Sequence, residues 1–250
     1  MSKSMVLSGP MSALRSRFGD REAIRRMAKA GFDAVDYTFN EMVSDDCVWN
    51  TPRWEEYGKE LLTLARDQGV FFNQAHAPFI FHTSYLPDWN REILPMQIRC
   101  MEACALLGIP HMVVHPVHHL PYHHRGAPGK SNADIIWDLN REYYHLLQPY
   151  AKQFGVKMCL ENMFGEDQRR GCLVPDMFSD PHEYAQFFDE LNDPDNFTCC
   201  IDTGHAGITR EDCGDTIRVM GSRVRALHLN DNDFRTDGHL IPFQGKIDWD

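Results

Sequence analysis

Seven short apolar segments alternate with longer amphipathic segments along the 250-residue chain, and this alternation restricts its fold more than any other feature. Short apolar runs are typical of buried strands, whereas the intervening segments carry apolar residues at helical spacing. The expected strands are 5–10, 32–37, 70–77, 111–116, 157–162, 197–204 and 224–231. The expected helices are roughly 20–30, 52–68, 90–107, 133–154, 180–191 and 211–221.

Strands with few polar positions, separated by helices, predict a parallel sheet covered by helices and therefore an α/β fold. The pattern continues without a linker or a change of composition, so we expect one domain over residues 1–250. An open doubly wound sheet and a closed (β/α)8 barrel both fit this pattern. A G-x-G-x-x-G sequence does not follow the first expected strand, which disfavours a dinucleotide-binding fold.

Local signals mark the ends of two expected helices. Asp20 is placed to cap the start of the helix in "DREAIRRMAKAG", and Gly31 stands where that helix should end. Asp180 and Pro181 are placed as the cap and the first residue of a later helix.

Charge and composition limit the classes of partner. The net charge of −11 disfavours non-specific binding to nucleic acid, which depends on clustered lysine and arginine, so no nucleic-acid partner is expected. An apolar run long enough to cross a membrane is missing from the sequence, and its first residues do not resemble a secretion signal. We therefore expect a cytoplasmic protein whose eight cysteines are mostly buried, reduced thiols.

Potential metal ligands end five successive expected strands, at His76, His115, Glu161, Asp202 and His228. Strand ends meet at one face of a parallel barrel, so we expect these side chains to converge there. Two carboxylates and one imidazole, from Glu161, Asp202 and His228, suit Mn²⁺, Mg²⁺, Co²⁺ or Zn²⁺. His205, three residues after Asp202, is expected to bind a substrate hydroxyl or a second metal.

The chain resembles the sugar phosphate isomerase/epimerase superfamily, the xylose-isomerase-like TIM barrels that also include endonuclease IV. Several segments carry the resemblance in order and spacing, namely "AHAPF", "VVHPV", "LENMFG", "CIDTGHAGI", "LHLNDND", "DGHLIP" and "GKIDW". The resemblance covers nearly the whole chain. It implies a (β/α)8 TIM barrel with a divalent metal, Mn²⁺ before Mg²⁺, Co²⁺ or Zn²⁺, at the face formed by the strand ends.

The resemblance also implies roles for individual residues. Ketose epimerases of this group bind their metal through Glu, Asp, His and a second Glu, and the first three match Glu161, Asp202 and His228. Glu161 would then move a proton beside a metal-bound carbonyl, with an enediolate intermediate, and His205 would bind a substrate oxygen. We expect further contacts with the substrate from a set at the strand ends and in the last loop, consisting of His76, His115, Asn162 and Arg235.

The sequence departs from the family pattern near its end. The second glutamate of the family lies on an eighth strand well beyond "IDW", whereas this chain stops at Asp250. The eighth βα unit is therefore missing from the sequence, and we expect the chain to be a piece of a longer protein. Relatives usually carry a glycine-rich sequence where this chain has "IPFQGKIDW", which predicts a different substrate pocket.

We expect a metal-dependent isomerase or epimerase that acts on a sugar or a related polyol ketone. A dehydratase or lyase of a sugar derivative would use the same proton abstraction. An abasic-site nuclease of the endonuclease IV type is a third reading, because that enzyme's zinc ligands match a wider set, namely His76, His115, Glu161, Asp202, His205, His228, Asp237 and His239. A non-catalytic subunit that needs a partner is a fourth. Whether the substrate is phosphorylated, and whether the protein forms homo-oligomers, is left open by the sequence.

Overall fold

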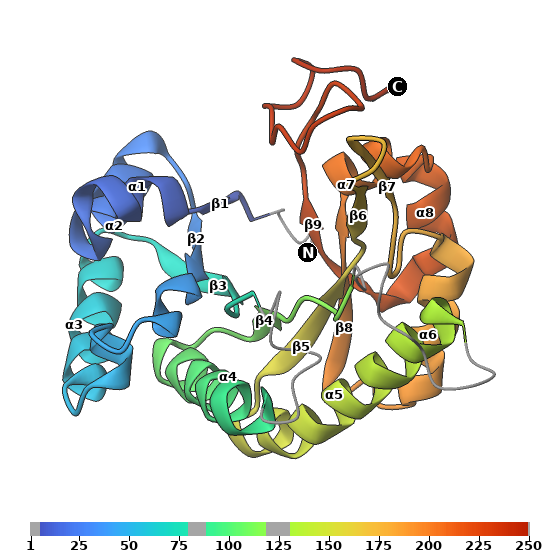
Figure 1. Cartoon of the computed structure of the whole chain (residues 1–250). Coiled ribbons are helices and arrows are strands. Elements are labelled where there is room, and N and C mark those ends of the chain that lie inside the picture. The colour runs from blue at the N-terminus through green and yellow to red at the C-terminus, as the bar shows by residue number, and fades with distance from the viewer. Residues whose placement is uncertain (1–5, 80–88, 119–130, 250) are drawn as a thin grey trace. The chain divides into compact units, whose positions relative to one another are not determined.

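The protein is described by a computed structural model over residues 6–79, 89–118 and 131–249 (Figure 1). Two compact units make up the chain. Unit 1 comprises Met1–Val114 and Pro149–Met158, and unit 2 comprises His115–Gln148 and Cys159–Asp250. Each unit is described by itself, and the single domain expected over residues 1–250 stays a prediction.

Unit 1 contains four parallel strands that neighbour one another in chain order. They are β1 (Ser8–Pro10), β2 (Ala34–Thr38), β3 (Phe71–His76) and β4 (His111–Val113). Helices and short 3₁₀ turns connect them, namely α1 (Ser12–Phe18), α2 (Asp20–Ala30), η1 (Asn40–Val43), η2 (Val48–Asn50), α3 (Trp54–Asp67) and α4 (Trp89–Leu107). Each strand therefore returns parallel to the one before it through a helical connection, as an α/β fold requires.

The core of unit 1 includes an ion pair that corrects one expectation. Asp20 does not cap α2, because Gly19 stands at the cap position and no side chain caps this helix. The Asp20 carboxylate is buried instead, with Nε of Arg15 2.5 Å from Oδ1 and the Tyr37 hydroxyl donating to Oδ2 over 3.0 Å. Partnered burial of both charges outweighed the local capping preference. Gly31 ends α2 in a left-handed conformation, as expected.

Unit 2 carries three parallel strands and one hairpin. The elements are α5 (Asn132–Phe154), β5 (Lys157–Glu161), β6 (Phe164–Asp167), β7 (Cys172–Pro175), α6 (Pro181–Leu191), β8 (Phe197–Asp202), α7 (Thr203–Thr209), α8 (Cys213–Met220), η3 (Gly221–Arg223) and β9 (Val224–His228). Helix α5 and strand β5 cross the boundary between the units. Strand β8 lies between β5 and β9, and β6 pairs with β7 in a separate antiparallel hairpin.

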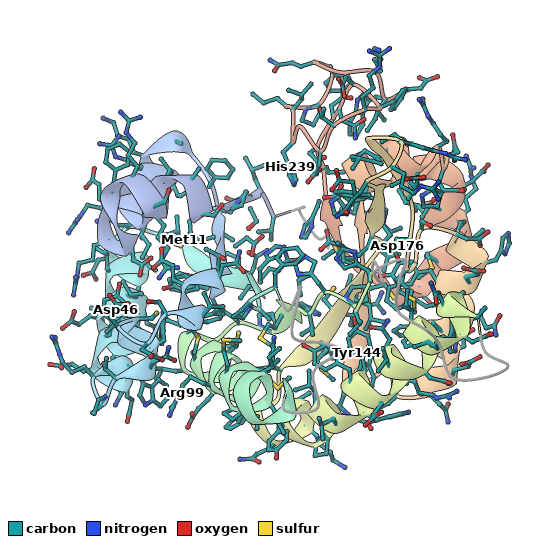
Figure 2. All side chains as sticks on the ribbon, in the orientation of Figure 1. Met11, Asp46, Arg99, Tyr144, Asp176 and His239 are labelled. Atoms are coloured by element: carbon teal, nitrogen blue, oxygen red, sulfur yellow. The ribbon has the colours of Figure 1, made fainter. Side chains whose placement is uncertain are left out.

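The core of unit 2 is aromatic. Tyr144 on α5, labelled in Figure 2, is fully buried, and its ring packs against Phe187 of α6 and Phe197 of β8. The Tyr184 hydroxyl donates to the main-chain oxygens of Leu160 and Cys200 over 2.6 and 3.1 Å. These contacts fix α5 and α6 against β5 and β8, whose ends carry the candidate site.

All seven expected strands and all six expected helices are present, with boundaries shifted by a few residues. At α6, Asp180 caps the helix by accepting from the main-chain N–H groups of His182 and Glu183, and Pro181 is its first residue. The sequence analysis missed a few short elements, namely α1, α7, η1, η2, η3 and the β6–β7 hairpin. Among the described residues, a strand does not follow β9.

The cysteines lie largely as expected. Six of the eight are buried and all are free, whereas Cys172 is exposed and Cys213 is partly exposed. Burial raises the pKa of several core thiols well above the usual value, including that of Cys200. Within the described ranges, none of the helices is long and apolar enough to cross a membrane.

Candidate metal centre and active site

Three potential metal ligands end three neighbouring strands of unit 2. Glu161 is the last residue of β5, Asp202 the last of β8 and His228 the last of β9. The parallel register of β8 and β9 places Asp202 directly opposite His228. All three side chains therefore lie at the same edge of the sheet, where the sequence predicted their convergence.

The donor atoms of these residues lie close together. Nδ1 of His228 is 2.8 Å from Oε1 of Glu161 and 3.8 Å from Oδ2 of Asp202. Nε2 of His115 is 3.1 Å from the other Glu161 oxygen, Oε2. Ligand atoms around one divalent cation are separated by roughly 3 Å, because metal–ligand bonds are about 2.0–2.2 Å long. His228 thus lies close to both carboxylates, and Glu161, Asp202 and His228 are donors of the kind that a divalent cation accepts.

The Glu161 carboxylate is buried but remains charged. Burial by itself raises the pKa of Glu161, yet the charge of His228 and the hydrogen bonds from His115 and His228 outweigh it and hold this pKa well below its usual value. A buried anion of this kind needs positive partners. The imidazoles of His115 and His228, or a cation bound beside them, can take that place here.

Two hydrogen bonds fix the side chain of Asp202. Its Oδ1 accepts from the main-chain N–H of His205 over 2.8 Å, which caps α7. Its Oδ2 accepts from the side-chain amide of Asn230 over 2.8 Å. Gly204 makes room for this contact, because a Cβ atom there would lie 1.8 Å from Oδ1 of Asn230. The orientation of the carboxylate is therefore set by α7 and by the chain just after β9.

Asn162 couples the ends of β5 and β8. Its amide nitrogen donates to the main-chain oxygen of Asp202 over 3.0 Å, and its amide oxygen accepts from the main-chain N–H of Asp202 over 2.8 Å. Both polar atoms of the side chain are engaged with this strand, and Asn162 is buried. These contacts support a role in positioning Asp202, whereas the expected contact with substrate stays a prediction.

His205 occupies the first turn of α7 beside this cluster. Its Nδ1 lies 2.8 Å from the main-chain oxygen of Asn162, which orients the ring. Burial lowers the pKa of His205, but the carboxylates of Asp202, Glu161 and Asp237 raise it above its usual value. The edge of its ring meets the aromatic ring of Phe164 in the β6–β7 hairpin, with centroids 4.9 Å apart. Phe164 is a neighbour of the site that the sequence analysis missed.

A second group of donors also lies beside His205. Nε2 of His205 is 3.8 Å from Oδ1 of Asp237, and Nδ1 of His239 is 3.2 Å from the same oxygen. Donor atoms of Asp202, His205 and His239 all lie within 4.8 Å of one another. His239, labelled in Figure 2, belongs to the loop that follows β9. This second group could bind a further cation.

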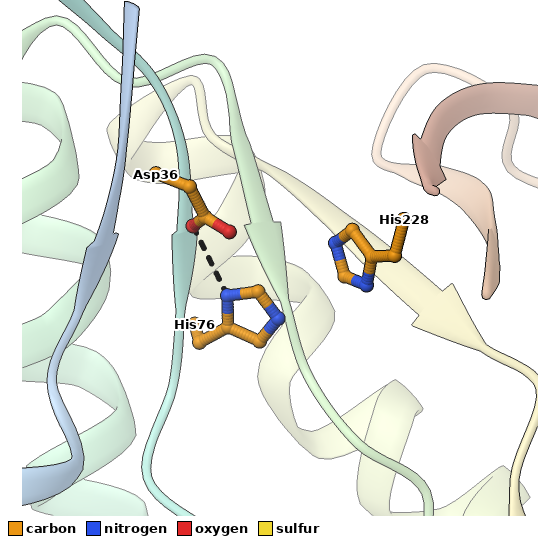
Figure 3. Close-up of side chains that lie close together, drawn as sticks. All are labelled: Asp36, His76 and His228. Carbon is orange, nitrogen blue, oxygen red and sulfur yellow. Dashed lines mark hydrogen bonds and ion pairs between the residues drawn. The ribbon is translucent and has the colours of Figure 1, made fainter. Parts of the chain in front are cut away.

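His76 pairs with an aspartate of its own unit, unit 1. Nδ1 of His76, at the end of β3, lies 3.0 Å from Oδ1 of Asp36 on β2 (Figure 3). The amide of Gln74 donates to Oδ2 of Asp36 over 3.1 Å. Carboxylates of this kind orient an imidazole and select its tautomer. The sequence analysis missed Asp36, and the expected contact of His76 with a substrate stays a prediction.

Two further expected contacts have different surroundings. His115 is buried and pairs with Glu161, so it lies within the cluster of unit 2. Arg235 lies in the loop after β9 with an exposed side chain, and its main-chain N–H donates to Oδ1 of Asp233 over 2.9 Å. The structure therefore brings one group together, consisting of His115, Glu161, Asn162, Asp202, His205 and His228, whereas Arg235 is exposed.

Curated relatives share part of this sequence. A "Probable endonuclease 4" from Methanoculleus marisnigri (strain ATCC 35101 / DSM 1498 / JR1) is 27% identical over 173 residues, which cover 62% of this chain and 55% of that protein. The uncharacterized protein y4fM of Sinorhizobium fredii (strain NBRC 101917 / NGR234) is 34% identical over 167 residues, which cover 65% of this chain and 48% of that one. The chain thus spans less than two thirds of the length of these relatives.

Similar solved structures have names of sugar epimerases. A D-tagatose 3-epimerase-like protein superposes with a TM-score of 0.73 at 18% identity, covering 98% of this chain and 83% of that one. A D-psicose 3-epimerase crystallised with D-fructose gives a TM-score of 0.65 at 17% identity, covering 90% and 73%. A 3-keto-D-glucoside 4-epimerase from E. coli gives 0.63 at 16% identity, covering 85% and 74%. The TM-scores show a common fold, which is all that identities this low support.

The family comparison agrees with the order of strands and helices. The family described as "Xylose isomerase-like TIM barrel" matches residues 24–250, which is most of the chain. The solved neighbours share that fold, so the expected barrel class and the expected resemblance are both confirmed. This chain belongs to the xylose isomerase-like TIM barrel family.

Proposed function

We propose that this protein is a divalent-metal-dependent isomerase or epimerase that acts on a sugar or a related polyol ketone. The observation that carries this proposal is the buried, charged Glu161 carboxylate beside His115 and His228, at the strand edge that also presents Asp202. The named substrates and activities of the solved neighbours, which include D-tagatose, D-psicose and 3-keto-D-glucoside epimerases, support the sugar class.

Glu161, Asp202 and His228 would hold the cation, with Mn²⁺ as the proposed ion. Two carboxylates and one imidazole are donors that suit Mn²⁺, although Mg²⁺, Co²⁺ and Zn²⁺ accept the same set. A cation bound there supplies positive charge that polarises a carbonyl group and lowers the cost of removing a neighbouring proton.

Side chains of the chain itself would carry the proton transfer. Glu161 stays ionised and can accept the proton from the carbon next to the carbonyl. Nε2 of His115, 3.1 Å from Oε2 of Glu161, is the adjacent group that can hold a proton. His205 is oriented by the main-chain oxygen of Asn162 and would bind a substrate oxygen. We also propose that His76 and Arg235 contact the substrate, as the family resemblance implies.

Solvent isotope exchange tests this function directly. The Mn²⁺-loaded protein is incubated in D₂O with a panel of ketoses and keto-sugars, and deuterium next to the carbonyl is measured by NMR. We expect exchange with at least one sugar, and we expect Glu161→Gln to slow it by about 10²–10⁴-fold. Glu183→Gln, which changes an exposed carboxyl on α6, should leave the rate unchanged.

Two results would contradict the proposal. One is the lack of exchange with every sugar of the panel, and the other is an exchange rate that Glu161→Gln does not change. Product analysis by NMR then separates an epimerase from a dehydratase or lyase, because elimination removes water from the sugar whereas epimerisation preserves its composition.

An abasic-site nuclease is the second candidate function. It is favoured by the placement of Asp237 and His239 beside His205 and by the relative named as a probable endonuclease 4. Its test is incision of a duplex that contains one abasic site, with Zn²⁺ or Mn²⁺ present. Efficient incision that His239→Ala abolishes, together with a lack of isotope exchange, would replace the epimerase proposal by this one.

A further inference from the structure

We propose that Asp231 is a positioning residue whose buried carboxylate holds the loop after β9, residues 229–249, so that Asp237 and His239 lie beside His205. This inference rests on the proposed function and extends it, because it adds a second cation-binding group around His205 and His239 beside the cation that Glu161, Asp202 and His228 would hold. Among the described residues, the hydrogen bonds of Asp231 are with its own loop and not with Glu161, Asp202, His205 or His228. Its effect on the site is therefore indirect, through the path of the main chain.

The Asp231 carboxylate collects hydrogen-bond donors from distant parts of this loop. Oδ1 accepts from the main-chain N–H groups of Asn232 and Ile247 over 2.8 and 3.0 Å. Oδ2 accepts from the main-chain N–H of Gly245 over 2.9 Å and from the indole N–H of Trp249 over 3.0 Å. Asp231 is fully buried. One side chain thus ties together the beginning and the far part of the loop.

The main chain of Asp231 adds a second tie. Its N–H donates to the oxygen of Leu240 over 2.7 Å, and the N–H of Leu240 donates back to the oxygen of Asp231 over 2.8 Å. Asp237 and His239 lie within the segment that this antiparallel bridge closes. Their positions are therefore limited by the pairing of Asp231 with Leu240 as well as by the carboxylate.

A glycine makes this close packing feasible. A Cβ atom on Gly245 would lie 2.2 Å from Oδ1 of Asp231 and 2.4 Å from the main-chain oxygen of Asn232. Such distances are much shorter than a van der Waals contact, so a larger residue would force the loop away from Asp231. Gly245 thus allows the approach that the carboxylate requires.

The tied loop also packs on the helix that carries His205. The side-chain amide of Asn232 donates to the main-chain oxygen of Gly204 at the start of α7. Phe234 and Ile247 of the loop pack closely on Gly207 of α7, since a Cβ atom on Gly207 would lie 3.1 Å from the Phe234 ring and 3.2 Å from the Ile247 side chain. Asp231 therefore organises a loop that is anchored to α7, and the ligand-type residues of the loop meet His205 on the same helix.

The tip of the loop, residues 235–241, has little apolar packing to hold it in place. Residues 235–241 are all exposed, and Ile241 and Phe243 expose 67% and 79% of their surface, so burial of apolar side chains contributes little there. Asp233 accepts from the N–H groups of Arg235 and Thr236, which closes a local turn only. Most of the hydrogen bonds that join distant parts of the loop converge on Asp231, whereas the main-chain N–H of Lys246 donates to the main-chain oxygen of Asn232 over 2.8 Å. Asp233 provides a matched control.

Hydrogen–deuterium exchange of the full chain tests the positioning. We expect Asp231→Asn to speed exchange at least tenfold at the amides of Gly245 and Ile247, while exchange in β8 and α6 stays unchanged. Asp233→Asn should affect only the turn at residues 233–236. Trp249→Phe, which removes a single donor, should give a smaller increase at the same amides and provides the test if Asp231→Asn fails to fold.

Cation binding tests the consequence for the site. Mn²⁺ titration by calorimetry is compared between the wild-type protein, Asp231→Asn, His239→Ala and His228→Ala. His239→Ala should remove binding at the second group, and His228→Ala should remove binding at Glu161, Asp202 and His228. We expect Asp231→Asn to weaken Mn²⁺ binding at the second group by about 10–100-fold and to leave the other binding unchanged. A general loss of folding would affect both kinds of binding equally.

The positioning role is overturned if Asp231→Asn leaves exchange at Gly245 and Ile247 unchanged, or if it weakens both kinds of binding alike. A failure of the proposed function looks different. In that case the wild-type protein shows neither Mn²⁺ binding nor isotope exchange with sugars, while Asp231→Asn still releases the loop amides selectively.

Discussion

The imidazole of His228 lies against the carboxylate of Glu161, with Nδ1 2.8 Å from Oε1, although the two residues are 67 positions apart in the chain. Each ends a strand of unit 2, and Asp202 ends the strand between them. The sheet therefore assembles a buried carboxylate, an imidazole partner and a second carboxylate from three separate segments. Such a group is costly to maintain unless a ligand or a proton is shared within it.

Removal of a bound cation should lower thermal stability. A cation present at about 100 times its dissociation constant stabilises a protein by about 2.7 kcal/mol. We therefore expect Mn²⁺ to raise the Tm of the wild-type protein and excess EDTA to reverse the change, as measured by differential scanning fluorimetry. His228→Ala should abolish most of the response, whereas His182→Ala, on the exposed face of α6, should retain it. An equal Tm with Mn²⁺ and with EDTA contradicts this expectation.

Asn162→Ala should destabilise the protein and disturb Asp202. The change removes two buried hydrogen bonds and leaves the main-chain N–H and oxygen of Asp202 without these partners. Unpaired buried polar groups cost roughly 1–3 kcal/mol each, so we expect a loss of about 2–4 kcal/mol in the free energy of unfolding. Urea denaturation measures it. Asn132→Ala, at an exposed position on α5, should change stability by less than about 0.5 kcal/mol.

Gly204→Ala should displace the side chain of Asn230, which holds the Asp202 carboxylate. A Cβ atom there would lie 1.8 Å from Oδ1 of Asn230 and 3.1 Å from Oδ1 of Asp202, so Asn230 must move away from the carboxylate that it holds. Forced packing of this kind costs about 1–3 kcal/mol. We expect that loss in thermal denaturation, together with weaker Mn²⁺ binding. Gly238→Ala is the control, since its nearest neighbouring atom would be 3.6 Å away. Similar effects of the two variants would refute the steric explanation.

Asp231 should give a pH-dependent contribution to stability. Burial raises the pKa of Asp231, but hydrogen bonds from Ile247, Trp249, Gly245 and Asn232 outweigh it and lower the value to about 2. The charged form is therefore favoured in the folded state, and its contribution is present above the unfolded pKa of about 4 and is lost as the pH falls towards 2. We expect Asp231→Asn to cost about 2 kcal/mol at neutral pH.

The acid dependence of that difference is the sharper measurement. Denaturation of the wild-type protein and of Asp231→Asn between pH 7 and pH 3 should show that the stability difference falls by about half at pH 3. A difference that stays constant over this range would mean that the carboxylate is not held in its charged form by the loop.

Much of the fold follows from local sequence signals. Apolar runs predicted the strands and helical periodicity predicted the helices, because burial imposes a period on the residues of each element. Asp180 with Pro181, and Gly31, marked helix ends correctly, since capping depends on neighbouring main-chain groups. Asp20 shows the limit of such signals. It stands at a helix start, yet its burial beside Arg15 gave it a different role.

The sequence by itself determined which residues end the strands, and therefore that Glu161, Asp202 and His228 would share one edge of a parallel sheet. Only the tertiary structure decided how they are supported. The side chain of Asn162 binds the main chain of Asp202 across 40 positions, and Asp231 reaches Ile247 and Trp249 across 16 and 18. Such hydrogen bonds form only where segments distant in the sequence come into contact. The residue pattern within one segment does not predict those contacts.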